Sequence, residues 1–386
     1  MEEKVQGRSY TSNHVKLLKH MDRLQLIQNG ERPKPVMFHM SPCNPCNLTC
    51  SFCCFANRAM KEMLTLEQMK SAIDQFADLG VLGMEFTGGG EPTLHPELDK
   101  AIEHAHNRGL KIGICTNGSK LRKVKNWHMI SWVRLGMYSW DEKKPYPYHL
   151  EVFDGLDIEI SAAYVWDGAT ETSTNPNITG NWNDPKAKKL ASNVYKEENF
   201  LKMLAWVEEK KIPCRIAFNA IKDTKIVAQD IETIKGLIAK HEEKNGKLKY
   251  AFLSDFNFKG VRRNNHCYMH MVKPCVFTNG NVYVCPSAEL APENNYAVND
   301  EFKICDIAGI TDFFNSQVGG AGVSLQTSRR TTVPSVSSAV ATGEDRGVVW
   351  STKGPETRTA SSSGQRHHRP AAQMGQSRNG RRRARP

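Results

Sequence analysis

The stretch Cys46-Asn47-Leu48-Thr49-Cys50-Ser51-Phe52-Cys53 places three cysteines at the spacing C-x3-C-x2-C on one short segment. Thiolates are the ligands of iron–sulfur clusters, and the spacing of the cysteines indicates the type of cluster. Three cysteines leave one iron of a [4Fe–4S] cluster without a protein ligand. An open coordination position is typical of a reactive metal site, whereas the ligand shell of a structural site is closed. The stretch therefore predicts a reactive cluster that binds a small molecule at its fourth iron.

Three other interpretations of these cysteines stay open. A zinc ion would take the same three thiolates and a fourth from Cys43 or Cys54, which flank the stretch. A disulfide framework would pair the cysteines. Buried cysteines without a chemical role are also common.

A second motif, Thr87-Gly88-Gly89-Gly90-Glu91-Pro92, follows the strand predicted at residues 83–87. Three glycines allow a sharp turn and a close approach of the backbone to a ligand. Taken alone, the motif is also typical of a glycine turn with an exposed glutamate.

In this order and separation, the two motifs resemble those of the radical S-adenosylmethionine (SAM) superfamily. In that family, the free iron binds SAM, and one electron from the cluster cleaves it to a 5′-deoxyadenosyl radical that abstracts hydrogen from a substrate. The resemblance implies that Cys46, Cys50 and Cys53 bind the cluster and that Phe52 lies near the adenine. It also implies that the glycine segment holds the SAM ammonium group; its residues are Gly88, Gly89, Gly90 and Glu91.

The periodicity of apolar residues predicts alternating strands and helices. The expected strands are 36–40, 83–87, 111–116, 133–138, 156–165, 214–220 and 248–253, and the expected helices are 14–28, 65–79, 96–108, 200–210 and 227–244. Alternation of this kind predicts an α/β fold with a parallel sheet. The resemblance implies a partial (β/α)6 TIM-like barrel with a small cysteine-rich C-terminal extension.

Further SAM contacts are implied at the ends of later strands. The turn Thr116-Asn117-Gly118 resembles a family segment that faces the substrate. Ser139 and Asp141 are candidates after the fourth strand, with Ser161 as the alternative if the family's strand is the next one. Asn219, late in a further strand, is another candidate cofactor-binding residue.

Two more cysteines, Cys115 and Cys214, lie within apolar strands and are expected in the core. If Cys115 faces the barrel interior instead, it becomes a candidate hydrogen donor to a substrate radical.

A C-terminal group of cysteines has the pattern C-x12-G-x4-C, in which Asn279-Gly280 predicts a tight turn of a hairpin. The pattern resembles the opening of the family's SPASM or twitch extension, which binds auxiliary clusters. A full SPASM domain has seven cysteines, so the four present suffice for one auxiliary cluster, with a structural zinc hairpin as the alternative. The candidate metal ligands are Cys267, Cys275, Cys285 and Cys305.

The net charge of +11 is concentrated in the C-terminal segment, which from residue 316 carries 12 Lys and Arg against 3 Asp and Glu. That segment lacks apolar periodicity and is expected to be disordered, with an arginine run that is a candidate for weak contact with nucleic acid. No apolar run is long enough for a membrane span. Eleven cysteines without a secretory signal predict a reducing, cytoplasmic location.

The expected organisation is an N-terminal extension (1–34), a core barrel (35–255), an auxiliary-cluster region (256–315) and a tail (316–386). The expected function is radical SAM chemistry on a peptide or peptidyl side chain, with flavodoxin or ferredoxin as the electron donor. The alternatives are modification of a nucleobase, nucleic acid or small metabolite, and a non-enzymatic zinc-binding interaction protein.

Overall fold

The computed structural model describes residues 19–29, 31, 33–53, 55–56, 58–137, 148–168, 197–219, 224–254, 272–284 and 302–316. The chain divides into two units, Met1–Thr342 and Gly343–Pro386, and every described residue belongs to the first unit. Apart from residue 316, the tail expected from the sequence lies outside the described residues.

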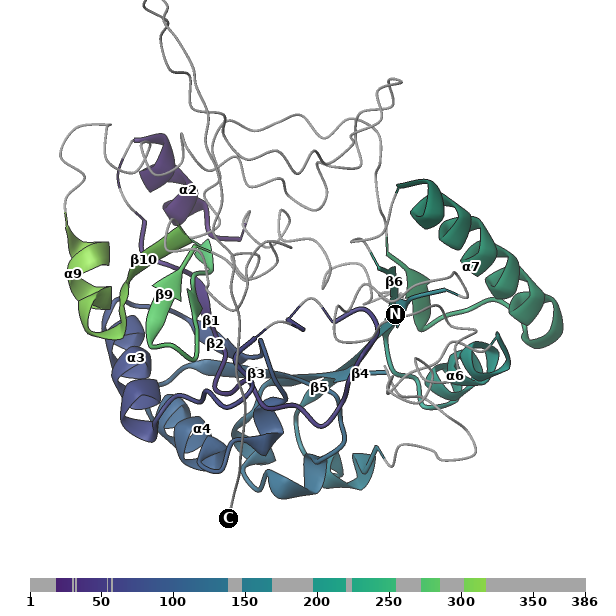
Figure 1. The fold of residues 1–386 in the computed structure, drawn as a ribbon, viewed down its shortest axis with the longest axis horizontal. Helices are drawn as coiled ribbons and strands as arrows, with labels where there is room; N and C mark the ends of the chain where they lie inside the picture. The colour runs from purple at the N-terminus through teal and green to yellow at the C-terminus, as the bar shows by residue number, and fades with distance from the viewer. Residues whose placement is uncertain are drawn as a thin grey trace, which may run out of the picture. The chain divides into compact units, whose positions relative to one another are not determined.

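The described strands form one sheet in the order β10-β9-β8-β1-β2-β3-β4-β5-β6-β7 (Figure 1). All seven strands that the sequence predicts are present, and each runs parallel to its neighbours. They are β1 (Met37–Met40), β2 (Gly83–Phe86), β3 (Lys111–Thr116), β4 (Trp132–Gly136), β5 (Glu159–Trp166), β6 (Cys214–Phe218) and β7 (Ala251–Leu253). The prediction of an α/β fold built on a parallel sheet is therefore confirmed.

The helices predicted at 65–79, 96–108, 200–210 and 227–244 are present between successive parallel strands. In the described part of the chain, the α-helices are α2 (Met21–Gln28), α3 (Leu66–Asp78), α4 (Leu98–Asn107), α6 (Glu197–Glu209), α7 (Thr224–Asn245) and α9 (Ile310–Asn315). Short 3-10 helices are η2 (Pro92–Leu94), η3 (Leu121–Lys123), η4 (Trp127–Met129), η5 (Leu150–Phe153) and η8 (Ile307–Gly309). Helix α3 begins at the predicted capping box, in which Thr65 and Gln68 each bond the other's backbone N–H.

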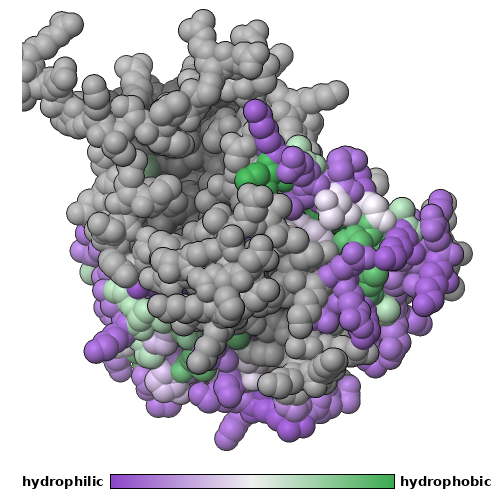
Figure 2. Space-filling view, turned by 45° about the vertical axis from the view of Figure 1, so that its right-hand side comes forward, coloured by the Kyte–Doolittle hydropathy of each residue, from purple (hydrophilic) through white to green (hydrophobic). Residues whose placement is uncertain are grey.

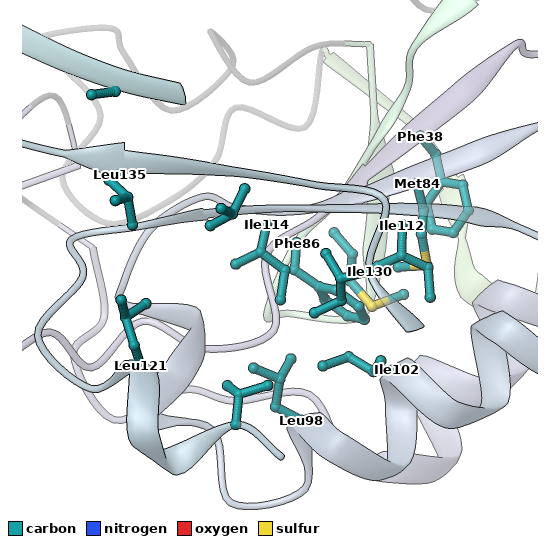
Figure 3. Close-up of a cluster of buried hydrophobic side chains, with 14 of the residues drawn as sticks. Phe38, Met84, Phe86, Leu98, Ile102, Ile112, Ile114, Leu121, Ile130 and Leu135 are labelled. Atoms are coloured by element: carbon teal, nitrogen blue, oxygen red, sulfur yellow. The ribbon is translucent and has the colours of Figure 1, made fainter. Parts of the chain in front are cut away.

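The two faces of the parallel sheet differ in chemistry because side chains alternate along each strand. One face is apolar and packs against α3 and α4, as Figure 3 shows. Its residues on the first four strands are Phe38, Met40, Met84, Phe86, Ile112, Ile114, Val133 and Leu135. The alternate positions form what we call the polar face, and they include His39, Glu85, Cys115 and Arg134.

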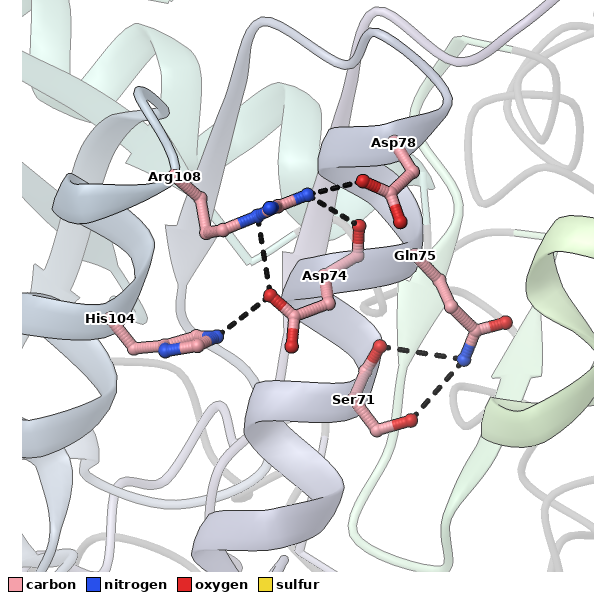
Figure 4. Close-up of polar contacts among 6 residues, drawn as sticks. All are labelled: Ser71, Asp74, Gln75, Asp78, His104 and Arg108. Carbon is pink, nitrogen blue, oxygen red and sulfur yellow. Dashed lines mark hydrogen bonds and ion pairs between the residues drawn. The ribbon is translucent and has the colours of Figure 1, made fainter.

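On the outside of the molecule, polar contacts join α3 to α4 (Figure 4). His104 Nε2 lies 2.8 Å from Asp74 Oδ1, and Arg108 Nε lies 3.2 Å from the same oxygen. Arg108 also contacts Asp78. These side chains are partly exposed to solvent, which screens their charges, so we expect each pair to contribute little to stability.

The C-terminal elements dock on α3. Gln75 Nε2 donates to Ile307 O at 2.6 Å, and the rings of Phe76 and Phe314 lie 6.1 Å apart. Lys34 Nζ donates to Phe314 O at 2.6 Å, which ties the segment before β1 to α9. The segment from 302 to 316 is thus packed on the same core as the parallel sheet.

The described surface is mostly hydrophilic in the view of Figure 2, with separate hydrophobic spots. The large apolar side chains that are exposed among the described residues are Met21, Met60, Met63 and Leu82. None of the helices in the described part is both long and apolar enough to cross a membrane.

The stacked pair Phe38 and Phe76 gives a test of the core, because Phe38 is 0% exposed and the two ring centroids lie 4.2 Å apart. We expect Phe38→Ala to lower the free energy of unfolding by about 3–5 kcal/mol, since it leaves a cavity between β1 and α3. The measurement is urea unfolding followed by circular dichroism. The control is Leu82→Ala at a side chain 54% exposed, for which we expect a change within about 0.5 kcal/mol. Equal losses in the two variants would contradict this account of the core.

Candidate cluster and cofactor site

The cysteine loop, residues 41–64, leaves the end of β1 and returns to the start of α3. Its two ends pair with each other: Leu64 N–H donates to Pro42 O, and Asn44 N–H donates to Glu62 O, both at 2.9 Å. Cys43 and Met63 form an antiparallel bridge between these donors. This closed base holds the part of the loop that carries Cys46, Cys50 and Cys53 at the carboxyl end of the parallel strands.

Cys46, Cys50 and Cys53 are all half-buried, and no disulfide joins the described cysteines. Burial raises the pKa of Cys46, and it raises the pKa of Cys50 well above the ordinary value. The charges of the other two sulfurs raise the pKa of Cys50 further, so the three side chains lie close enough to interact. Buried thiols grouped in this way become thiolates when a metal centre compensates their charge. This donor set fits an iron–sulfur cluster.

Cys43 is placed differently. Its thiol donates to Glu91 O at 3.3 Å, and burial raises its pKa to about 12. This cysteine therefore faces the glycine motif rather than joining the other three as a fourth ligand. Cys54, the other candidate for a fourth thiolate, lies outside the described residues. Within the described ranges, no three His, Cys, Asp or Glu side chains are arranged to hold a single metal ion.

The sequence analysis missed Arg58, a buried residue of the cysteine loop. Its guanidinium donates to Asn44 O at 2.7 Å and to Phe55 O at 2.6 Å, and Nη1 lies 3.5 Å from Cys53 Sγ. The charge of Arg58 lowers the pKa of the neighbouring cysteines and so opposes the effect of burial. The sequence shows an arginine five residues after Cys53. Only the fold shows that its side chain points back toward Asn44 and Cys53.

The glycine motif, residues 87–92, packs directly on the cysteine loop, which explains its three glycines. A Cβ on Gly88 would lie 2.5 Å from the Ser41 side chain, and one on Gly90 would lie 2.2 Å from Pro45 O. A Cβ on Gly89 would meet a side-chain oxygen of the loop at 2.3 Å. Gly88 also has φ +115, a conformation that side chains rarely adopt.

Backbone hydrogen bonds fasten the two segments together. Gly89 N–H donates to Ser41 Oγ at 3.0 Å, and Gly90 N–H donates to Cys43 O at 3.0 Å. Glu91 N–H then donates to Pro45 O at 2.9 Å. The three bonds fix the position of the glycine motif relative to the cluster cysteines.

Glu91 is not an exposed side chain but a buried one that holds the site together. Its Oε1 accepts from the Thr93 N–H at 3.1 Å, the Thr93 hydroxyl at 2.7 Å and the Thr116 hydroxyl at 2.5 Å. Its Oε2 accepts from Asn117 N–H at 2.7 Å. Burial raises the pKa of Glu91, and the four donors oppose that shift. The carboxylate therefore joins the glycine motif to the turn after β3.

That turn, residues 116–119, reaches the cysteine loop. Asn117 Nδ2 donates to Asn47 Oδ1 at 3.0 Å and lies 4.0 Å from Cys46 Sγ. Asn47 Nδ2 donates in turn to Ser119 Oγ at 2.9 Å. The three segments that the sequence analysis singled out thus meet at one end of the sheet, beside Cys46.

Comparison with known proteins finds a family whose matched segment includes the cysteine loop, the glycine motif and the 116–119 turn. The family model of the Radical SAM superfamily matches residues 40–158, which run from the end of β1 to just before β5. This segment is therefore similar to the domain of that superfamily. A family of this kind uses a [4Fe–4S] cluster and SAM, so the predicted cofactors agree with the match.

Among curated relatives, an S-adenosylmethionine-dependent nucleotide dehydratase from Flammeovirga pacifica is 34% identical over 124 residues, or 30% of this chain and 42% of that protein. The antilisterial bacteriocin subtilosin biosynthesis protein AlbA from Bacillus subtilis (strain 168) is 30% identical over 96 residues, or 25% of this chain and 21% of that protein. The chain thus spans less than half the length of these two relatives. Among solved structures, Streptococcus suis SuiB bound to the precursor peptide SuiA has a TM-score of 0.48 and 15% identity, covering 78% of this chain and 72% of that one.

Two other predicted cofactor-binding residues, Phe52 and Asn219, lie at the same end of the sheet. Phe52 is half-buried in the cysteine loop. Asn219, buried after β6, donates to Asp167 Oδ1 at 2.8 Å, and the charge of Asp167 raises the pKa of Cys50. Ser161, by contrast, lies within β5 and donates to the backbone at 3.2 Å.

Two of the remaining candidates, Ser139 and Asp141, lie outside the described residues.

The predicted C-terminal hairpin is confirmed. Strand β8 (Cys275–Val276) pairs with β9 (Asn281–Tyr283) across a turn in which Gly280 has φ +76, and β10 (Lys303–Asp306) pairs with β9. Strand β8 also runs parallel to β1, so the hairpin extends the sheet of the radical SAM domain. No local pattern of residues indicates this pairing between β1 and β8.

The two described cysteines of this region, Cys275 in β8 and Cys305 in β10, lie on opposite faces of the sheet. Cys275 of β8 pairs with Tyr283 of β9, and Cys305 of β10 pairs with the preceding residue of β9, Val282. Adjacent positions on a strand face opposite sides, and accordingly Cys275 packs with Phe277 while Cys305 packs against the main core. Cys267 and Cys285 lie outside the described residues, so an auxiliary cluster stays a prediction.

The two strand cysteines occupy different faces. Cys214 is in the apolar core, as expected. Cys115 is instead on the polar face, where its thiol donates to Glu85 Oε1 at 2.8 Å. Glu85 Oε2 lies 2.9 Å from both His39 Nε2 and Lys273 Nζ. The sequence analysis missed this group because Glu85 and Lys273 are 188 residues apart.

Glu91→Gln tests the role of the buried carboxylate. The amide keeps one acceptor oxygen and sets an NH2 group against N–H or O–H donors, so we expect the free energy of unfolding to fall by about 1–3 kcal/mol. We also expect the variant to retain less iron after anaerobic reconstitution, because the turn near Cys46 loses its anchor. Urea unfolding and iron analysis measure the two effects. The matched control is Glu97→Gln, whose carboxylate contacts Lys100 at the surface. Equal behaviour of the two variants would contradict the role of Glu91.

Proposed function

We propose that this chain is an enzyme that cleaves SAM reductively and removes a hydrogen atom from a substrate. The observation that carries the proposal is the packing of the cysteine loop, the glycine motif and the 116–119 turn around buried Glu91. When bound, the cluster and SAM supply the 5′-deoxyadenosyl radical that the family uses.

The residues of this chain have distinct tasks in the proposal. The thiolates of Cys46, Cys50 and Cys53 hold the cluster, and Arg58 compensates part of their negative charge. The glycine motif lies against the cysteine loop without side chains, so its backbone is available to a ligand at close range. The electron comes from a one-electron donor of the flavodoxin or ferredoxin class.

We propose a peptide or peptidyl side chain as the substrate. Two kinds of relative support this choice by their names: AlbA, a bacteriocin biosynthesis protein, and the PqqA peptide cyclase of Xanthomonas oryzae pv. oryzae (strain MAFF 311018), 32% identical over 88 residues. The hairpin β8–β9 and strand β10 also extend the sheet beside β1. An extension at this edge adds surface for a substrate larger than a metabolite.

A nucleotide is the second candidate substrate. The relatives named S-adenosylmethionine-dependent nucleotide dehydratases, from Flammeovirga pacifica and Selenomonas ruminantium, have 34% and 36% identity to this chain. Both matches cover less than a third of the chain.

The reaction is tested by replacing Cys46, Cys50 and Cys53 together with alanine. We expect the full chain, reconstituted anaerobically and given SAM and dithionite, to form 5′-deoxyadenosine, and we expect the triple variant to form none because the cluster has lost its ligands. Chromatography of the nucleoside and iron analysis are the measurements. The matched control is Cys214→Ala, at a cysteine in the apolar core, and it should keep both iron and activity. Bound zinc and no 5′-deoxyadenosine from the native chain would contradict the proposal.

The substrate class is tested by adding either a pool of synthetic peptides containing every residue type or a mixture of nucleoside triphosphates to the same assay. We expect the peptides to increase 5′-deoxyadenosine formation and to change in mass. An increase with the nucleotides alone would overturn the peptide proposal in favour of the second candidate. Iron above about four per chain would support the auxiliary cluster.

A further inference from the structure

Arg58 is a buried cation of the cysteine loop, and it forms no ion pair with a carboxylate in the part of the chain that the structure describes. Its side chain is on a residue only 8% exposed. Moving a cation out of water is unfavourable unless acceptors or negative charges compensate it. Arg58 Nη1 lies 3.5 Å from Cys53 Sγ, so thiolates that hold a cluster would bring negative charge to this place. A buried guanidinium here is therefore suited to a charged group bound by the cysteine loop.

Successive turns of the backbone bring Arg58 back to Cys53. Cys53 N–H donates to Cys50 O at 3.2 Å, and Ala56 N–H donates to Cys53 O at 3.3 Å. Arg58 N–H then donates to Phe55 O at 3.2 Å. The segment from 50 to 58 therefore folds on itself, which places the Arg58 side chain beside the sulfur of Cys53.

Two carbonyl groups fix the plane of the Arg58 guanidinium. Nε donates to Asn44 O at 2.7 Å, and Nη1 donates to Phe55 O at 2.6 Å. A guanidinium is planar and its N–H groups have fixed directions, so these two bonds also set the direction of the second N–H on Nη1. That N–H donates to Cys53 Sγ. The contact is therefore a directed hydrogen bond to a predicted cluster ligand.

The C-terminal hairpin and the glycine motif hold this arrangement in place. Asn44 is 2% exposed, and its Nδ2 donates to Oγ1 of Thr278, which lies in the turn between β8 and β9, at 2.9 Å. The Thr278 hydroxyl donates in turn to Glu62 Oε2 at 3.0 Å, on the returning arm of the cysteine loop. A Cβ on Gly89 would lie 3.1 Å from Arg58 Cδ, so the glycine motif packs against the arginine side chain. The position of the guanidinium thus depends on two segments far from it in the sequence.

We propose that Arg58 is a positioning residue that raises the reduction potential of the cluster through its hydrogen bond to Cys53, and that the β8–β9 hairpin holds Arg58 in place through Asn44. The inference rests on the proposed function and deepens it. One electron passes from the flavodoxin- or ferredoxin-class donor, which is oxidised, to the cluster, which gains one negative charge. A cation and an N–H donor beside the sulfur stabilise the more negative state, and net charge and hydrogen bonds to the sulfurs set the potential of such clusters.

A redox titration of the reconstituted full chain, followed by electron paramagnetic resonance, tests the role of Arg58 without SAM or substrate. The signal of this cluster is the one absent from the triple cysteine variant. Arg58→Met removes the charge and the N–H donors, so we expect the ratio of reduced to oxidised cluster at a fixed potential to fall about tenfold, or about 59 mV for one electron. Arg58→Lys keeps the charge without the fixed N–H directions, so its potential should lie between the other two. Equal potentials in the native chain and Arg58→Met would overturn the proposal.

Matched controls and a hairpin variant use the same titration. Arg108→Met removes a guanidinium from the outer helices, and Thr233→Val removes a hydroxyl that bonds the backbone of α7, so both should keep the native potential. Thr278→Val removes the hydroxyl that holds Asn44, and it should lower the potential by less than Arg58→Met does. No shift in Thr278→Val would overturn the part assigned to the hairpin.

Iron analysis of each sample separates this inference from the proposed function. A native chain that takes up no cluster would overturn both. A native chain that holds the cluster and forms 5′-deoxyadenosine, with a potential that does not depend on Arg58, would overturn the inference alone. If Arg58→Met holds no cluster, Arg58→Lys decides: a potential below the native one supports the proposal, and an unchanged potential overturns it.

Discussion

The site depends on one buried carboxylate. Glu91 accepts four hydrogen bonds from η2 and from the turn after β3, and its own backbone N–H bonds the cysteine loop. A buried carboxylate persists only where donors replace its lost hydration. The donors come from η2, which follows β2, and from the end of β3. The hydrogen bonds to the Glu91 carboxylate therefore hold these two segments together. The arrangement of the cysteines relative to the glycine motif follows from this requirement.

The two faces of the parallel sheet have different roles. Its apolar face packs against α3 and α4 and supplies the core, as Figure 3 shows for Phe38, Met84 and Ile112. The polar face carries ionised groups whose burial is unfavourable unless they are paired, and Glu85 is paired with Lys273 from the segment before β8. The segment that leads into the hairpin therefore contributes a charge to the polar face.

Much of the fold was predictable from the sequence because its signals are local. The capping box at Thr65 and the apolar runs of the seven strands each depend on residues close in the chain. The cysteine motif and the glycine motif could be recognised for the same reason, because each lies within one short stretch of the sequence. The partners of Glu85 and the pairing of β8 with β1 join segments far apart in sequence, so no local pattern indicates them. The register of β9 and β10, which sets Cys275 and Cys305 on opposite faces, is likewise decided only by the folded sheet.

The central claim is that three cysteines hold a cluster with one iron open to SAM. The most direct measurement is electron–nuclear double resonance on the reduced, reconstituted full chain with SAM labelled with 15N at its amino group. The account predicts a hyperfine coupling between the cluster and the labelled nitrogen, since the open iron binds it. A cluster that shows no coupling to SAM, or one whose four irons are all bound by cysteine, would contradict the account.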